Sequence, residues 1–196
     1  MNKKMDKWIY QLRITLIDSR PRIWRRILVE EDVLLSDLHK IIQTTMGWTN
    51  SHLHQFIKDE TFYTKRMPDD DYWEEMNNVD YKGIKLNEIL RFVKNTIIYE
   101  YDFGDGWEHE ILLEKFLKPD SNVKYPVCID GAMKCPPEDV GGMGGYMDML
   151  KVLRNPNHRE YESFINWLGE EFDPKEFDIS MVNKLLAKRN YGLPRF

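Results

Sequence analysis

The sequence predicts an α+β fold: a β-grasp-like mixed sheet packed on one main helix, with a C-terminal helical extension. Three observations predict it. Residues 8–57 show two strand-like alternations, one helical stripe and a third strand, in that order. A second strand pair follows over residues 96–114, and beyond Pro119 the chain becomes rich in Pro and Gly before further helical stripes. We expect a single domain over residues 1–196, with a sheet-plus-helix core at 1–118 and an extension at 119–196.

The first hairpin and the main helix are indicated by the spacing of their apolar residues. Residues 8–16 alternate as a half-buried strand does, and residues 23–29 repeat the period of two after a turn that contains Pro21. Ser36 is the expected N-cap of the helix, and Gly47 is its expected stop. The helical stripe between them consists of Leu38, Ile41, Ile42 and Met46.

A third strand, an acidic loop and a short helix are expected next. We assign the strand to residues 51–57 and the short helix to residues 86–90. Between them, residues 59–80 hold eight acidic side chains against two basic ones, and a charge run of this kind is typical of a solvated loop. A connection of this length is uncommon in a compact domain unless it is a lid, a binding loop or disordered.

The second hairpin has a register that its apolar residues define. A three-residue loop at residues 104–106 pairs Tyr101 with His109 and keeps the aromatic side chains on one face. The same register places Asp102 opposite Glu108, and like charges across a strand pair are unfavourable. We expect arginines of the first strands to offset them, with a cation or a basic partner as the alternative. The second carboxylate pair is Glu100 and Glu110, and the arginines are Arg13 and Arg25.

Further helices are expected in the C-terminal extension. Residues 146–153, 161–168 and 182–186 carry helical stripes, and Asp173 followed by Pro174 indicates a helix start. The two cysteines, Cys128 and Cys135, lie too far apart for the usual zinc-knuckle spacing, so we expect two buried thiols.

Composition and charge exclude several classes of protein. With 42% hydrophobic and 31% charged residues, the chain is neither disordered nor collagen-like, and two cysteines do not make a disulfide scaffold. No segment approaches the roughly 20 apolar residues of a membrane span, and no apolar signal core follows the basic start. We therefore expect a cytoplasmic protein without a membrane partner.

An arginine cluster on the first hairpin is the candidate interaction surface. Arg22, Trp24, Arg25 and Arg26 supply what a phosphate or nucleic-acid patch needs, namely several guanidinium groups around one aromatic ring. The net charge of the chain is −5, which argues against non-specific affinity for nucleic acid.

His52 and His54 are the candidate metal ligands. On a strand, alternate residues share a face, so both imidazoles are expected to point the same way. A metal site needs further ligands, and the candidates are carboxylates from the hairpin and from the following turn. The alternative is a pair of histidines that are hydrogen-bonded within the sheet. The candidate carboxylates are Asp102, Glu108, Glu138 and Asp139.

A Gly-rich stretch at residues 136–146 admits two interpretations. Four glycines before a helix could present backbone N–H groups to an anion. The stretch lacks the Lys-Ser/Thr of a P-loop and the spacing of a dinucleotide fingerprint, and Glu138 and Asp139 would repel a phosphate. The alternative is a close-packed turn that joins the sheet to the helices.

Several motifs together resemble one known family. They are PRIWRR at residues 21–26, MGW at 46–48, SHLHQF at 51–56, YEYDFGDGWEH at 99–109, CPPEDVGG at 135–142, WLG at 167–169 and FDP at 172–174. This set resembles the plasmid pRi ORF-three-like family over nearly the whole chain. The resemblance implies a single prokaryotic α+β unit, and it brings no activity, cofactor or catalytic residues.

Two functional hypotheses follow from these residues. The leading one is a non-catalytic binding or interaction module for a protein or a nucleic-acid-associated partner, because no complete catalytic constellation is present. The alternative is a metal-dependent hydrolase that uses a His/carboxylate site and a divalent metal.

Overall fold

The computed structural model describes residues 7–67, 73 and 77–194. Among them, eight strands form a single sheet in the order β5-β4-β3-β6-β7-β1-β2-β8. The strands are β1 (Ile9–Leu16), β2 (Trp24–Glu30), β3 (His54–Lys58), β4 (Thr61–Thr64), β5 (Asn78–Asp80), β6 (Thr96–Tyr101), β7 (Trp107–Leu117) and β8 (Val127–Ala132).

The sheet is mixed, since β4 and β5 pair in parallel and the other neighbouring strands pair antiparallel. Its longest strand pair is β1–β7, and the alternate residues that these strands turn inward, such as Leu12, Ile14 and Ile111, are fully buried. The predicted α+β class is confirmed. The finer comparison with a β-grasp sheet stays a prediction, as does the division of one domain at residue 118.

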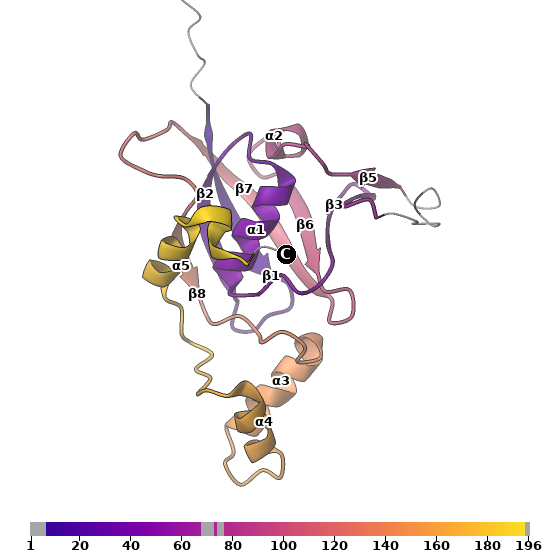
Figure 1. Cartoon of the computed structure of the whole chain (residues 1–196), viewed down its shortest axis with the longest axis vertical. Helices are drawn as coiled ribbons and strands as arrows, with labels where there is room; N and C mark the ends of the chain where they lie inside the picture. Colours follow the sequence, from indigo (N-terminus) through magenta and orange to yellow (C-terminus); the bar gives the residue numbers. More distant parts are fainter. Residues whose placement is uncertain (1–6, 68–72, 74–76, 195–196) are drawn as a thin grey trace, which may run out of the picture.

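Helix α1 (Leu35–Met46) covers one face of the sheet (Figure 1). Its side chains Leu38, Ile41 and Ile42 are fully buried, and burial of each such side chain stabilises the fold by about 1.5–3 kcal/mol. The helix ends as predicted at Gly47, whose φ of 95° is left-handed. The predicted N-cap was wrong: the helix begins before Ser36, and the backbone carbonyl of Ile84 accepts from Leu35 N instead of a side-chain cap.

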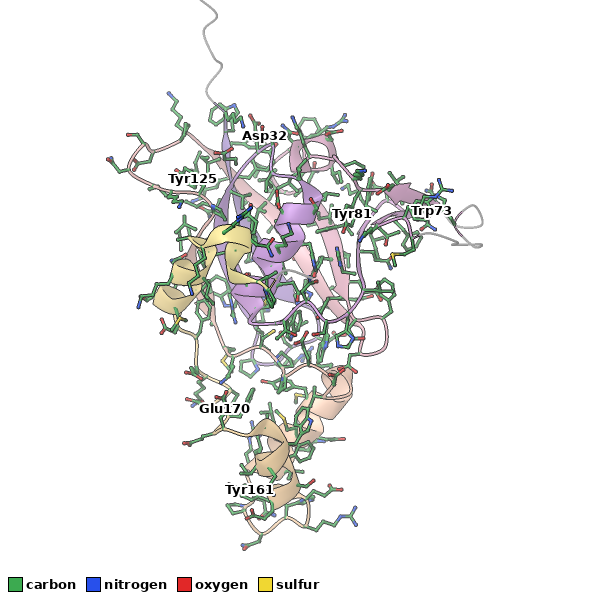
Figure 2. All side chains as sticks on the ribbon, in the orientation of Figure 1. Asp32, Trp73, Tyr81, Tyr125, Tyr161 and Glu170 are labelled. Atoms are coloured by element: carbon green, nitrogen blue, oxygen red, sulfur yellow. The ribbon has the colours of Figure 1, made fainter. Side chains whose placement is uncertain are left out.

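The remaining helices lie in two places. Helix α5 packs on β8 and α1, and the short η2 segment also contacts α1. Helices α3 and α4 pack on each other and project away from the sheet (Figure 1), where Tyr161 is labelled in Figure 2. No helix of the described residues is long and apolar enough to cross a membrane. The bounds are α2 (Leu86–Ile89), α3 (Gly142–Leu153), α4 (Tyr161–Leu168), α5 (Ile179–Leu186) and η2 (Arg189–Gly192).

Several expected elements differ from the observed ones. The acidic segment is not one uninterrupted loop, because β4 and β5 lie within residues 59–80; its residues 68–72 and 74–76 are outside the described part of the chain. Strand β8 was not predicted, and it pairs antiparallel with β2 at the edge of the sheet. Asp173 and Pro174 form a turn without a helix, and the last helix is capped instead by Asp178, whose side chain accepts from Met181 N.

The second hairpin has a different register from the predicted one. Tyr101 pairs with Trp107, and Tyr99 pairs with His109, so the loop is two residues longer than expected. A shift of two residues keeps every side chain on its predicted face. Glu100 therefore faces Glu108. The expected arginine does not contact Glu100; its carboxylate accepts from Gln55 Nε2 on β3 at 2.6 Å.

Candidate functional site

The longer hairpin loop is shaped by Asp102. Its backbone is left-handed, with φ 57°, and its N–H donates to Leu53 O at 2.9 Å. Its Oδ1 accepts from the backbone N–H of Gly104 at 3.1 Å and of Asp105 at 3.4 Å. An aspartate tolerates this backbone conformation because its side chain bonds the chain two residues on. One carboxylate oxygen therefore holds the turn, and Oδ2 is left over.

The Gly-rich turn packs directly on the hairpin tip. Gly141 N donates to Asp105 Oδ2 at 3.2 Å, and a Cβ at Gly142 would lie 2.5 Å from Asp105 O. A Cβ at Gly145 would lie 1.9 Å from Val140 O. These contacts fit the close-packed-turn interpretation, since the glycines are needed for backbone approach. The turn carries Asp139, also left-handed at φ 60°, to the hairpin tip.

His52 is positioned by Tyr101 and Glu138. The backbone N–H groups of Ser51 and His52 donate to Tyr101 Oη at 2.9 and 3.3 Å, and the Tyr101 hydroxyl donates to Glu138 through a short hydrogen bond. Glu138 also accepts from Thr49 N at 3.1 Å and Thr49 Oγ1 at 2.6 Å. Burial, with Glu138, raises the pKa of Tyr101, so its hydroxyl stays protonated and keeps donating. Glu138 thus fixes the segment that carries His52.

The hairpin turn, the Gly-rich turn and the contacts of Tyr101 with Glu138 together bring His52, Asp102 and Asp139 close to one another. His52 Nε2 lies 3.2 Å from Asp139 Oδ1 and 3.6 Å from Asp102 Oδ2. One ligand atom from each residue lies within 4.8 Å of the others, and this is the one such group of three found in the described residues. The Asp102 side chain is 11% exposed, whereas that of Asp139 is 72% exposed, so the cluster opens to solvent on one side.

The distance of 3.2 Å between His52 Nε2 and Asp139 Oδ1 fits the ligand shell of a cation, and the 3.6 Å to Asp102 Oδ2 lies just outside it. Two ligands that bind one ion at about 2.1 Å in tetrahedral or octahedral geometry are about 3.0–3.4 Å apart. The His52 Nε2 atom is buried and has no hydrogen-bond partner among the described residues, so neither carboxylate oxygen lies along its N–H direction. A cation shared by the three residues would lie on the axis of the ring nitrogen, with the carboxylate oxygens beside it.

His54 does not join this cluster. Its ring stacks on His39, with 3.4 Å between the centroids, and its Nε2 is 2.9 Å from Tyr81 Oη. Burial lowers the pKa of His54 to about 2, so the imidazole is neutral. The two histidines that were predicted to act as a pair therefore lie in different surroundings. Glu108 is also apart from the cluster: it is exposed beside buried Trp107 and His109, on the opposite face of β7.

Two arginines of the cluster, Arg25 and Arg26, make contacts within the fold. Arg25 is 2% exposed, and its guanidinium donates to the carbonyls of Thr45, Trp24, Ala132 and Met133. Arg26 pairs with Glu114 at 2.7 Å and with Asp130 at 2.9 Å. Arg22 is exposed and Trp24 is half-buried. These four residues therefore do not form one solvent-facing cationic patch.

A second polar network was missed by the sequence analysis. Asn50 N donates to Gln43 Oε1 at 2.9 Å, and Gln43 Nε2 donates to Tyr99 Oη at 2.9 Å. Tyr99 Oη lies 2.8 Å from His39 Nδ1, and His39 Nε2 lies 2.7 Å from Asn50 Oδ1. Gln43 and His39 are one turn apart on a helix, which is the one pattern that could have indicated them. Cys128 and Cys135 are buried free thiols, as expected.

The pattern of a known family matches residues 8–181, and that family is described as plasmid pRiA4b ORF-3-like protein. The chain belongs to this family. The uncharacterised protein y4hQ of Sinorhizobium fredii (strain NBRC 101917 / NGR234) is 35% identical to this chain over 182 residues, which cover 90% of this chain and 89% of that protein.

A solved structure is similar to this pRiA4b ORF-3-like chain. It is the crystal structure of the protein of unknown function MM3350 from Methanosarcina mazei Go1, with a TM-score of 0.78 and 38% identity. The match covers 89% of this chain and 97% of that one. The predicted family is confirmed, and the names of these relatives state no activity.

Proposed function

We propose that the protein is a divalent-cation-binding protein, with His52, Asp102 and Asp139 as ligands, and that this centre serves hydrolysis. The observation that carries the proposal is the buried, unpartnered Nε2 of His52 at 3.2 and 3.6 Å from two carboxylate oxygens of the described chain. One nitrogen and two carboxylate oxygens suit Zn²⁺ or Mn²⁺.

The chain prepares each ligand before an ion arrives. Hydrogen bonds from Gly104 and Asp105 hold Asp102 Oδ1, which leaves Oδ2 directed at His52. Tyr101 and Glu138 fix the backbone of residues 49–52. Such supporting contacts are typical of metal sites, where groups around the ligands set ligand orientation.

Three protein ligands leave coordination positions open on the exposed side of Asp139, which is the arrangement of catalytic metal sites. A bound divalent ion lowers the pKa of a coordinated water to about 7 and so supplies hydroxide at neutral pH. The remaining requirement is room for a substrate, and His52 also lines a cavity.

The test is metal binding by protein purified without a histidine tag. We expect elemental analysis to find bound Zn or Mn, and titration calorimetry with Zn²⁺ and Mn²⁺ to show one site per chain. His52→Gln and Asp139→Asn should each weaken binding at least about tenfold. Asp148→Asn, which changes an exposed carboxylate on α3 that pairs with Lys151, is the matched control. Equal binding by all four proteins, or no binding by the unaltered chain, would refute the proposal.

One specific observation supports the interaction-module hypothesis. Helices α3 and α4 project from the sheet, α4 has no buried residue, and Trp167 on it is 48% exposed. An exposed aromatic residue on a projecting helix is typical of a protein contact. Sedimentation over a range of concentrations, compared between the unaltered chain and Trp167→Gln, tests whether this surface joins two copies.

A further inference from the structure

A cavity of about 830 Å³ borders the cluster of His52, Asp102 and Asp139. It is lined by residues of α1, β3, β4, β5 and η2, and His52 contributes to its wall. Tyr81, labelled in Figure 2, lies to one side of α1, and η2 lies beside α1 as well (Figure 1). The volume is in the range of about 300–1,000 Å³ that small-molecule sites occupy.

The floor of this cavity is held rigidly. Asn50 Oδ1 can only accept, so His39 Nε2 carries the proton and His39 Nδ1 accepts from the Tyr99 hydroxyl. With the two bonds made by Gln43, four hydrogen bonds close a ring. The imidazole of His54 stacks on that of His39, which is part of this hydrogen-bonded ring. His54 Nδ1 has no hydrogen bond to any described residue. The cavity thus offers a fixed polar surface with one unused ring nitrogen.

The charge of the lining points to an anionic ligand. No Asp or Glu is among its described residues, although 33 of the 196 residues of the chain are acidic. The charged groups of the lining are Lys40 and Lys65. Lys40 pairs with Asp37 at 3.2 Å, whereas Lys65 has no ion pair within the described chain.

The rim of the cavity is apolar. Leu53, Met67 and Phe103 are lining residues that are each about half exposed. Such side chains can cover the apolar body of a ligand whose charged end meets the exposed Lys65. A cation at His52 and the ammonium group of Lys65 would together balance a dianion better than a single carboxylate.

We propose that this cavity binds a phosphate monoester with an apolar or aromatic body, its phosphoryl group between Lys65 and the metal centre. The choice of a dianion rests on the proposed function. The site requires the Lys65 cation and the open side of the His52 cluster to act on one ligand.

The probe is phenyl phosphate, titrated by calorimetry into the full chain with and without Mn²⁺. We expect binding that phenol does not reproduce and that Lys65→Gln weakens about fivefold, as the loss of one ion pair of an exposed lysine does at its upper value. Lys82→Gln is the matched control, because Lys82 is exposed and does not line the cavity. Chelation with EDTA should weaken binding further in the unaltered protein.

The outcomes separate the two proposals. Equal effects of Lys65→Gln and Lys82→Gln, or equal binding of phenol and phenyl phosphate, would overturn the anion site. Metal uptake without phenyl phosphate binding would overturn the anion site and leave the metal centre supported. Binding of phenyl phosphate that depends on Lys65 in a chain that takes up no metal would overturn the metal centre and support the anion site.

Discussion

At the scale of single residues, Asp102 uses its two carboxylate oxygens differently. Oδ1 holds the hairpin turn and Oδ2 faces His52. Asp102→Asn keeps an acceptor for the turn and tolerates the left-handed backbone, but it removes the charge. We expect this variant to retain its stability and to lose at least about tenfold in metal affinity.

Asp102→Ala should lose both properties. We expect a fall of about 1–2 kcal/mol in the free energy of unfolding, because the turn N–H groups lose their acceptor and alanine disfavours φ 57°. Urea unfolding and metal titration of the two variants check the pair. If Asp102→Asn bound metal as well as the unaltered chain, Asp102 would not be a ligand.

Arg25 shows how a residue with a functional pattern can be structural. Its guanidinium satisfies four backbone carbonyls that join β2 to the end of α1 and to β8, and it lies 3.9 Å over the Phe177 ring. Arg25→Gln leaves several of these carbonyls without donors. We expect a loss of about 2–4 kcal/mol in urea unfolding, because buried acceptors lose charged donors.

The neighbouring Arg22 is the control for this prediction. It is exposed and follows the same turn, so Arg22→Gln should change the free energy of unfolding by less than about 0.5 kcal/mol. Similar losses for the two variants would show that Arg25 does not cross-link these elements. Sequence could not separate these arginines, since burial of Arg25 depends on Thr45, Ala132 and Met133, all distant along the chain.

At the scale of elements, the Gly-rich turn determines where Asp139 lies. Gly145→Ala would place a Cβ 1.9 Å from the Val140 carbonyl, a backbone atom that cannot rotate away. We expect a loss of at least about 2 kcal/mol in stability and a weaker metal site, because the turn must shift. Gly144 has nothing within 4 Å of the same position. Gly144→Ala should therefore stabilise α3 by up to about 1 kcal/mol.

Urea unfolding and metal titration on this pair separate the two effects. The prediction is wrong if both alanine variants are equally stable. The expected loss of metal affinity is wrong if Gly145→Ala is destabilised while its metal affinity is unchanged, because the position of Asp139 would then not depend on the turn.

The elements differ in how far sequence could predict them. Strands β1 and β2, helix α1 and the family were indicated by local periodicity and motifs, and the faces of the second hairpin were correct. Its loop length was not, because Asp102 closes a longer turn by side-chain hydrogen bonds that no periodicity records. His52, Asp102 and Asp139 were each candidates, but their convergence depends on Gly142 meeting Asp105, a contact between segments far apart in sequence.

At the scale of the whole molecule, the buried His39 and His109 and the half-buried His54 make stability depend on pH. Burial lowers the pKa of His39 and of His109 to about 4 and that of His54 to about 2. In the unfolded chain each titrates near 6.5, so below that pH the unfolded state binds protons that the folded state does not. Stability is therefore present above pH 6.5 and lost as the pH falls from 6.5 towards about 4.

The expected loss can be divided among the histidines by substitution. At pH 5 each contributes a loss of about 2 kcal/mol relative to neutral pH, so the three together give about 6 kcal/mol as an upper value. His109 donates from Nδ1 to backbone carbonyls inside the core, and His109→Gln removes one titrating group. Urea unfolding at pH 7.5 and pH 5.0 should show a drop smaller by about 2 kcal/mol in this variant. His158→Gln, at a partly exposed residue after α3, should leave the drop unchanged. The same drop in His109→Gln and in the unaltered chain would mean that His109 is not held neutral by the fold.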